Sequence, residues 1–167
     1  GLSVGSSAFA NNSSLASLTI NASGTGGISI GSSAFQNGVL EELTMTGKIK
    51  SIASDAFKNN QLPDNQAFIM CRNSDGTENS ILCSYGGANR SNITIADNVT
   101  SLANATFNGL GLTGTLNTGN GVTAIEDSKF SSNSLTNVII GDAVTVIGVN
   151  AFSSNKIETL TLGDSLT

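Results

Sequence analysis

A phenylalanine recurs along this chain at nearly constant spacing and closes a similar seven-residue segment each time. The segment ending at Phe35, Ser-Ile-Gly-Ser-Ser-Ala-Phe, is typical. The six copies end at Phe9, Phe35, Phe57, Phe107, Phe130 and Phe152, with successive spacings of 26, 22, 50, 23 and 22 residues. A fixed period of this length is the signature of a repeat architecture, in which each copy forms one structural unit. The single long spacing indicates an insertion or a degenerate copy.

Other apolar residues keep a constant position relative to each phenylalanine. Five positions earlier the chain always has an aliphatic residue: Val4, Ile30, Ile52, Leu102, Ile125 or Ile147. Further upstream, apolar and polar residues alternate, as in Leu135, Val138 and Ile140. This alternation predicts a short β-strand with one buried face. The Ser-Ser-Ala-Phe stretch, followed by Asn or Gly, predicts one helical turn with a left-handed exit.

One strand and one turn bury too little surface to offset the conformational entropy lost on folding. Stacked copies bury each other's faces, so stability becomes a sum over repeats and their neighbours. The six phenylalanines are therefore predicted to be core residues that stack as an internal column. Each buried ring contributes about 2–3 kcal/mol by area, and truncation to alanine costs about 3–5 kcal/mol.

Composition excludes several classes of function. Ser, Asn, Gly and Thr make up almost half of the 167 residues, charged residues are 11%, and the net charge is −5. The chain has no histidine, which removes Ser-His-Asp and Cys-His catalysis and the usual nitrogen ligand of zinc. Seven scattered cationic residues do not form a nucleic-acid surface, and no apolar run approaches the roughly 20 residues of a membrane helix. We predict no catalytic residue, no metal, no cofactor and no membrane insertion.

The long spacing contains the least repetitive part of the chain, residues 63–89. Two strand-like runs, residues 68–72 and 81–85, flank a turn that contains Asp75 and Gly76, which predicts a β-hairpin insertion. Cys71 and Cys83 lie symmetrically about the turn. They form either a disulfide, which suits an extracellular setting, or two buried thiols, and the sequence leaves both readings open.

The hairpin also concentrates residue types that are common in binding sites. The candidate partner-binding residues are Phe68, Arg72, Asp75 and Tyr85, together with Ile139, the one apolar residue on a threonine-rich outward strand face. The structural alternative is that the two aromatic rings cover an otherwise exposed edge. At one repeat position Asp97, Asp142 and Asp164 recur, and these carboxylates are expected to bond the backbone of turns rather than to hold a cation.

The repeat resembles the BspA-like (Treponema-type) leucine-rich repeat, Leu-x-x-Leu-x-Ile followed by Val-Thr-x-Ile-Gly-x-x-Ala-Phe, and its best copy is residues 135–152. The resemblance implies a right-handed solenoid, mostly β, from a secreted or bacterial cell-surface protein that acts in adhesion or interaction rather than catalysis. Thr106 and Lys129 replace the alanine before the phenylalanine, so those two turns are expected to pack less tightly.

We therefore expect a single leucine-rich-repeat domain over residues 1–167, which starts and ends within a repeat and is flanked by further repeats in a longer chain. The expected function is a non-catalytic extracellular or cell-surface module that binds an unidentified protein or glycan partner. A passive spacer is the main alternative. A polysaccharide-active β-helix would need three strands per coil and a carboxylate cluster, which the repeat does not offer.

Overall fold

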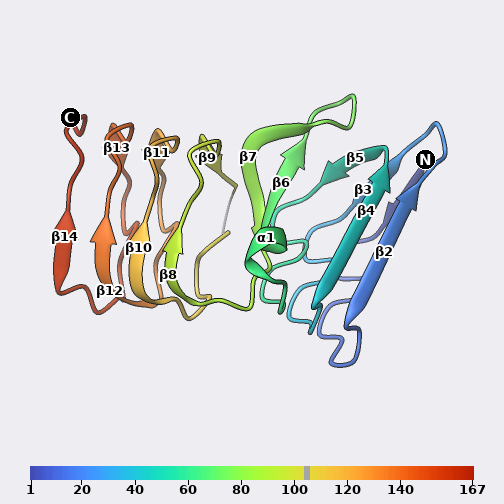
Figure 1. Ribbon diagram of the computed structural model, residues 1–167, viewed down its shortest axis with the longest axis horizontal. Helices are drawn as coiled ribbons and strands as arrows, with labels where there is room; N and C mark the ends of the chain where they lie inside the picture. Colours follow the sequence, from blue (N-terminus) through green and yellow to red (C-terminus); the bar gives the residue numbers. More distant parts are fainter. Residues whose placement is uncertain (104–105) are drawn as a thin grey trace. The chain divides into compact units, whose positions relative to one another are not determined.

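The computed structural model describes residues 1–103 and 106–167, which form two compact units, Gly1–Asn89 and Arg90–Thr167. Regular structure in the described residues is almost entirely β-strand, with one four-residue helix (Figure 1). Equivalent strands of successive repeats pair in parallel within each unit, which is the arrangement of a solenoid. The prediction of a mostly β repeat solenoid is confirmed.

The first unit contains two parallel sheets and a hairpin. The strands β1 (Leu2–Val4), β3 (Ile28–Ile30) and β5 (Ile49–Ile52) form one sheet, and β2 (Ser17–Ala22) pairs with β4 (Glu42–Gly47) in the other. The helix α1 (Asp64–Ala67) leads into the antiparallel pair β6 (Phe68–Arg72) and β7 (Glu78–Tyr85). Register follows the repeat: Leu18 lies opposite Leu43, and Ile30 opposite Ile52.

The second unit contains a four-stranded parallel sheet and a shorter pair. Its strands are β8 (Ser91–Thr94), β9 (Ser101–Leu102), β10 (Thr113–Asn117), β11 (Ala124–Ile125), β12 (Ser134–Ile139), β13 (Val146–Ile147) and β14 (Thr159–Thr161). Strands β8, β10, β12 and β14 lie side by side in that order, and β11 pairs with β13 (Figure 1). Leu116, Val138 and Leu160 are in register on neighbouring strands, which places one aliphatic residue per coil at the same position.

In five of the six copies, the segment that precedes the phenylalanine forms a tight turn instead of the predicted helical turn; the copy before Phe107 includes residues 104–105, which lie outside the described residues. In the second copy, the amide of Ala34 donates to the carbonyl of Gly31 at 3.3 Å, and that of Gln36 to Ser33 at 3.1 Å. The residue two positions before the phenylalanine has a positive φ of 56–62° in every described copy: Ser7, Ser33, Asp55, Ser128 and Asn150. A left-handed residue at that position interrupts a right-handed helix. The predicted left-handed exit is present two residues after the ring, as at Asn37.

The recurring phenylalanine rings stack within each unit. Ring centroids of Phe9, Phe35 and Phe57 are 5.3 Å apart at each step, with interplanar angles of 4° and 8°. In the second unit the corresponding distances are 5.1 Å from Phe107 to Phe130 and 5.2 Å from Phe130 to Phe152. Most of these rings are buried, whereas Phe9 is 46% exposed.

Buried or partly buried asparagines three residues after the phenylalanine join neighbouring coils. The side-chain amide of Asn133 donates to the carbonyls of Phe107 and Phe130, and its Oδ1 accepts from the amide of Leu112 at 2.9 Å. Asn60 and Asn155 make the same set of bonds in their own coils. Each asparagine therefore satisfies backbone groups that the stacking of coils removes from water.

Candidate functional site

The chain leaves the repeat at Leu62 and rejoins it at Gly86–Ala88. The amide of Leu62 donates to the carbonyl of Gly86 at 3.0 Å, and the amide of Ala88 donates to the carbonyl of Leu62 at 2.8 Å. A Cβ on Gly87 would meet the Cβ of Ala67 at 2.6 Å and the hydroxyl of Tyr85 at 2.8 Å. Only glycine fits where the two ends of the insertion meet, so α1 and the hairpin extend from a closed base. The predicted hairpin insertion is confirmed.

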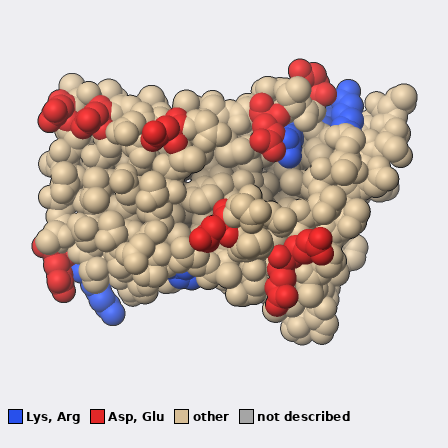
Figure 2. Space-filling model, in the orientation of Figure 1, with Lys and Arg blue, Asp and Glu red and all other residues tan. Residues whose placement is uncertain are grey.

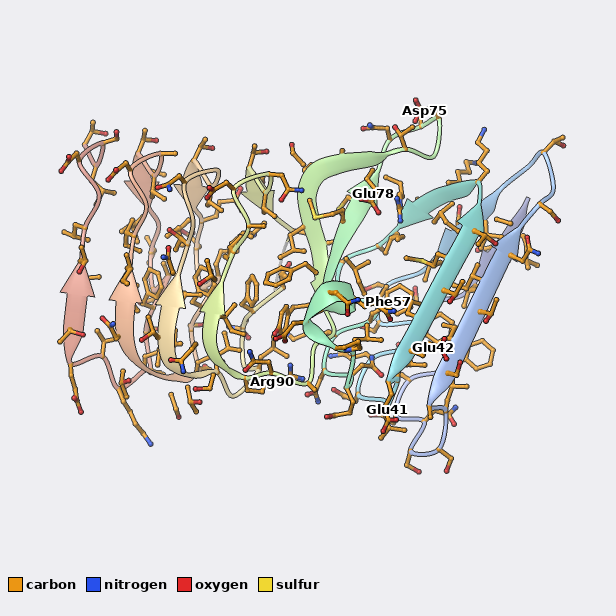
Figure 3. The ribbon with its side chains drawn as sticks, in the orientation of Figure 1. Glu41, Glu42, Phe57, Asp75, Glu78 and Arg90 are labelled. Atoms are coloured by element: carbon orange, nitrogen blue, oxygen red, sulfur yellow. A yellow bond between two sulfur atoms is a disulfide. The ribbon has the colours of Figure 1, made fainter. Side chains whose placement is uncertain are left out.

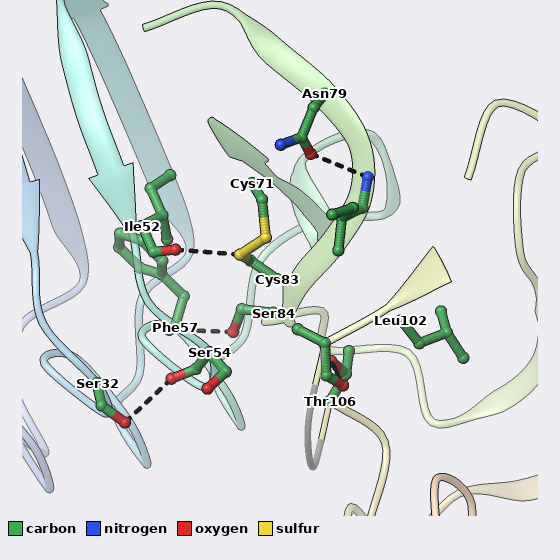
Figure 4. Close-up of a disulfide and its surroundings, with 12 residues drawn as sticks. Ser32, Ile52, Ser54, Phe57, Cys71, Asn79, Cys83, Ser84, Leu102 and Thr106 are labelled. Carbon is green, nitrogen blue, oxygen red and sulfur yellow. Dashed lines mark hydrogen bonds between the residues drawn. A yellow bond between two sulfur atoms is a disulfide. The ribbon is translucent and has the colours of Figure 1, made fainter. Parts of the chain in front are cut away.

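A disulfide joins the two strands of the hairpin. Cys71 of β6 and Cys83 of β7 are bonded, with their Cα atoms 5.0 Å apart. The Cys83 sulfur is buried and lies 3.1 Å from the carbonyl oxygen of Ile52, at the end of β5 (Figure 4). Of the two readings that the sequence left open, the structure shows the bonded pair. The disulfide ties β6 to β7, and the Cys83 sulfur contacts the solenoid core of the first unit.

The tip of the hairpin is a well-bonded turn. Asp75 accepts hydrogen bonds from the amide of Thr77 at 2.9 Å and from its hydroxyl at 2.7 Å. These bonds hold the pKa of the exposed Asp75 carboxyl below its usual value. The amide of Asn73 donates to the carbonyl of Thr77 at 2.8 Å, which closes the loop. Figure 3 shows Asp75 at the outer end of the hairpin, with Glu78 nearer its base. The tip therefore presents a fixed carboxylate to solvent.

Arg72 and Glu78 form an ion pair across the hairpin beside a small cavity. Arg72 Nη1 lies 2.9 Å from Glu78 Oε1, and the two side chains are 12% and 61% exposed. The cavity, about 160 Å³, is lined by α1, by β4 and by both members of the ion pair. Its lining residues are Leu43, Met45, Asn65, Gln66, Phe68, Ile69, Met70, Arg72 and Glu78.

The edge of β4 contributes to this cavity because no strand pairs with it there. Within the described residues, β2 is the one strand that pairs with β4. The amide of Leu43, at the edge away from β2, donates to the side-chain oxygen of Gln66 at 2.9 Å. The insertion thus replaces the next parallel strand with a side chain from α1 and leaves a hollow where the strand would lie.

The structure brings four of the five candidate binding residues together on the hairpin and separates the fifth. Tyr85 is 1% exposed, and its hydroxyl donates to the carbonyl of Asn89 at 2.8 Å. Phe68 packs edge-on against Tyr85, with ring centroids 5.1 Å apart, and it is partly buried. These two rings line the base of the insertion, as the structural alternative expects. Asp75 is exposed at the tip, whereas the Arg72 side chain is mostly buried. Ile139 is partly buried on β12 in the second unit.

The recurring aspartates lie along one edge of the second unit. Asp97 Oδ1 accepts from the amide of Asn120 at 2.7 Å, and Asp142 Oδ1 accepts from the amide of Asp164 at 3.3 Å. Figure 2 shows acidic side chains in a row at this edge. The carboxylates of Asp97 and Asp142 therefore bond the backbone of the next coil, which is the turn role predicted for these residues. Across the described residues, no group of three or more His, Cys, Asp or Glu side chains could hold a metal ion.

Three residues that shape the cavity could not be identified from the sequence. Asn65, Gln66 and Glu78 are not among the positions that recur from copy to copy, and their proximity to β4 depends on how the insertion folds back. In the described part of the chain, no helix is long and apolar enough to cross a membrane.

The repeat matches a described family over most of the chain. The BspA type Leucine rich repeat region matches residues 2–73 and 83–167 in six copies. The unmatched residues, 74–82, include the tip of the hairpin. Comparisons with curated proteins and with solved structures find no match. Six matching copies, together with parallel strands and one stacked phenylalanine per coil, establish that the chain belongs to the BspA-type leucine-rich repeat family.

Proposed function

We propose that this chain is a non-catalytic interaction module of a secreted or bacterial cell-surface protein, and that it binds its partner through the hairpin and the adjacent cavity. BspA-type leucine-rich repeat proteins are often surface-associated, and leucine-rich-repeat solenoids are typically non-catalytic scaffolds. The disulfide between Cys71 and Cys83 supports an oxidising location, because such bonds persist outside the cytosol.

One observation carries the assignment of binding to this region. The hairpin contains residues 74–82, the internal stretch that the family model leaves unmatched, and a disulfide and a bonded turn hold the hairpin in shape. A rigid protrusion loses little conformational entropy when a partner binds, so its contacts translate into affinity. A spacer would need none of these features.

The test uses the intact chain and a matched pair of charge reversals. Asp75→Lys changes the exposed tip of the hairpin, and Asp164→Lys makes the same charge change at an exposed position of the second unit. The probes are a panel of purified extracellular matrix proteins and an array of neutral and acidic glycans. We expect the unmodified chain to bind at least one probe and Asp75→Lys to weaken that binding at least ten-fold, with Asp164→Lys unchanged.

Two results would contradict the proposal. If the two charge reversals reduce binding equally, recognition depends on net charge rather than on the hairpin. If no probe binds and both variants fold, the passive spacer becomes the better description. Circular dichroism and thermal unfolding of each variant establish that the fold is retained.

A further inference from the structure

Strand β4 has a free backbone edge on the side away from β2. Along a strand, successive backbone N–H groups point alternately to the two sides. The amide of Glu42, the first residue of β4, donates to the carbonyl of Ala16 beside β2 at 3.2 Å. The next amide, that of Leu43, points the other way and donates to Gln66. The amide of Met45 therefore points to the same side as that of Leu43, where no strand of the described residues pairs with it.

The cavity of about 160 Å³ extends from this edge of β4 to the hairpin. Strand β6 pairs with β7 and stands at the end of its sheet (Figure 1). The lining includes Phe68, Ile69 and Met70, three consecutive residues of β6 whose side chains alternate between its two faces. A cavity that contacts consecutive residues meets a strand at its edge, not on one face. Together with Leu43 and Met45 of β4, the lining therefore belongs to two strand edges.

The charges around the cavity favour a cationic ligand. Three of the elements that line it begin with an exposed carboxylate: β4 at Glu42, α1 at Asp64 and β7 at Glu78. Figure 3 shows Glu42 at the base of β4 and Glu78 on the hairpin. In the described lining the one cationic side chain is that of Arg72, which Glu78 already pairs at 2.9 Å. The net charge of −5 adds long-range attraction for a basic partner.

Resting on the proposed function, we propose that an extended, basic segment of a partner protein adds as a strand to the free edge of β4. Its backbone pairs with the amide of Met45, and lysine or arginine side chains reach Glu42 and Asp64. One apolar side chain of the segment enters the cavity, whose volume is below the roughly 300–1,000 Å³ of pockets that enclose small molecules. In this mode of recognition the backbone bonds supply affinity, and the pocket and the charges select the sequence.

Selective labelling gives a direct reporter for this interaction. The chain has two methionines, Met45 and Met70, so ¹⁵N-methionine labelling yields two backbone amide signals, which Met70→Leu assigns. The probes are the pentapeptide acetyl-Lys-Thr-Leu-Thr-Lys-amide, its counterpart with glutamate in place of both lysines, and the basic peptide N-methylated at its three central amides. We expect the basic peptide to shift the Met45 signal saturably and to slow its hydrogen exchange at least five-fold. The other two peptides should each give an effect at least five-fold smaller.

Several outcomes would overturn the proposal. Equal responses to the basic peptide and its N-methylated version would mean that backbone pairing does not hold the ligand. Equal responses to the basic and acidic peptides would remove the role of the carboxylates. Equal protection at β14, which also stands at the end of a sheet, would indicate that any free strand edge binds the peptide. If the Met45 signal does not respond while Asp75→Lys still weakens capture of a matrix protein, this strand site is wrong and the proposed function stands.

A matched pair of charge reversals gives an independent measurement. Glu42→Lys places a positive charge at the start of β4, and Glu158→Lys makes the same change at the exposed residue before β14. We expect Glu42→Lys to weaken binding of the basic peptide at least five-fold and Glu158→Lys to leave it unchanged, with thermal unfolding establishing that both variants fold. Equal weakening in both variants would assign binding to net charge, and no weakening in either would contradict the placement of the peptide beside β4.

Discussion

The side-chain amide of Asn133 donates to the carbonyl oxygen of Phe107, 26 residues earlier in the chain, at 2.9 Å. The same nitrogen donates to the carbonyl of Phe130 at 3.0 Å, so one buried amide bonds two consecutive coils of the second unit. The rings of these two phenylalanines stack on each other, and the asparagine bonds their backbone. Apolar stacking and polar bonding therefore act on the same pair of residues.

Removing the Asn133 amide should strongly destabilise the second unit. Asn133→Ala leaves buried backbone groups of Leu112, Phe107 and Phe130 without their partner, and we expect the free energy of unfolding to fall by about 3 kcal/mol. Urea denaturation measures the change. Asn98→Ala, at an exposed asparagine, is the control and should change stability by less than about 0.5 kcal/mol. Similar losses in the two variants would mean that the buried amide has no special role.

The position of a ring in its stack should determine the cost of losing it. Phe130 is fully buried between two rings, so Phe130→Ala should lower the free energy of unfolding by about 4 kcal/mol. Phe9 is half-exposed and contacts one ring, so Phe9→Ala should cost about 2 kcal/mol or less. Chemical denaturation of both variants tests the order, and an equal cost would contradict it.

The disulfide should stabilise the hairpin by restricting the unfolded chain. Cys71 and Cys83 are 12 residues apart, and closing a loop of this length contributes about 3 kcal/mol in the chain-entropy description. We expect the double variant Cys71→Ala and Cys83→Ala to lose about that much, and hydrogen exchange to accelerate in β6 and β7 more than in β12. Adding a reductant to the double variant should have no further effect, whereas the unmodified chain should respond to it. Uniform acceleration of exchange across the chain would contradict a local role.

The turn at the tip of the hairpin should loosen at low pH. Hydrogen bonds from Thr77 lower the pKa of Asp75 from its ordinary 3.8, so the folded turn favours the ionised carboxylate. This contribution is present above the ordinary value and is lost as the pH falls through the lower folded value. An NMR titration of the Thr77 amide should therefore give a midpoint below 3.8, and Asp75→Asn should abolish that transition. A midpoint at or above 3.8 in the unmodified chain would show that the bonds do not favour the ionised form.

The solenoid was predictable because its determinants are periodic. An aliphatic residue five positions before each ring needs only local spacing to be recognised, and Ile30 and Ile52 indeed lie in register on neighbouring strands. The conformation of the turns was harder to predict, because residues such as Ser33 adopt a positive φ that non-glycine residues rarely take. A glycine at this position would have indicated a positive φ, whereas a serine such as Ser33 does not.

Lys129 shows how tertiary context changes the meaning of a substitution. A lysine in place of the alanine before Phe130 predicts a looser turn, yet the lysine is 3% exposed. Its ammonium group donates to the carbonyl of Leu102 at 2.8 Å and pairs with Glu126 at 2.6 Å. Neither partner is identifiable from the repeat pattern, because one lies on the preceding coil and the other on an exposed turn. The same reason applies to the cavity, where Gln66 meets β4 only after the insertion folds back.

The bonds made by the buried asparagines have a genetic consequence. Each one connects a coil to the preceding coil through the same backbone atoms, so removing or duplicating one whole coil within a unit would replace a neighbour with an equivalent one. Asn155 would find the same carbonyls on whichever coil precedes it. Unequal recombination between copies of the repeat can therefore lengthen or shorten such a gene in steps of one period, while a shift of a few residues would misalign every ring and amide downstream.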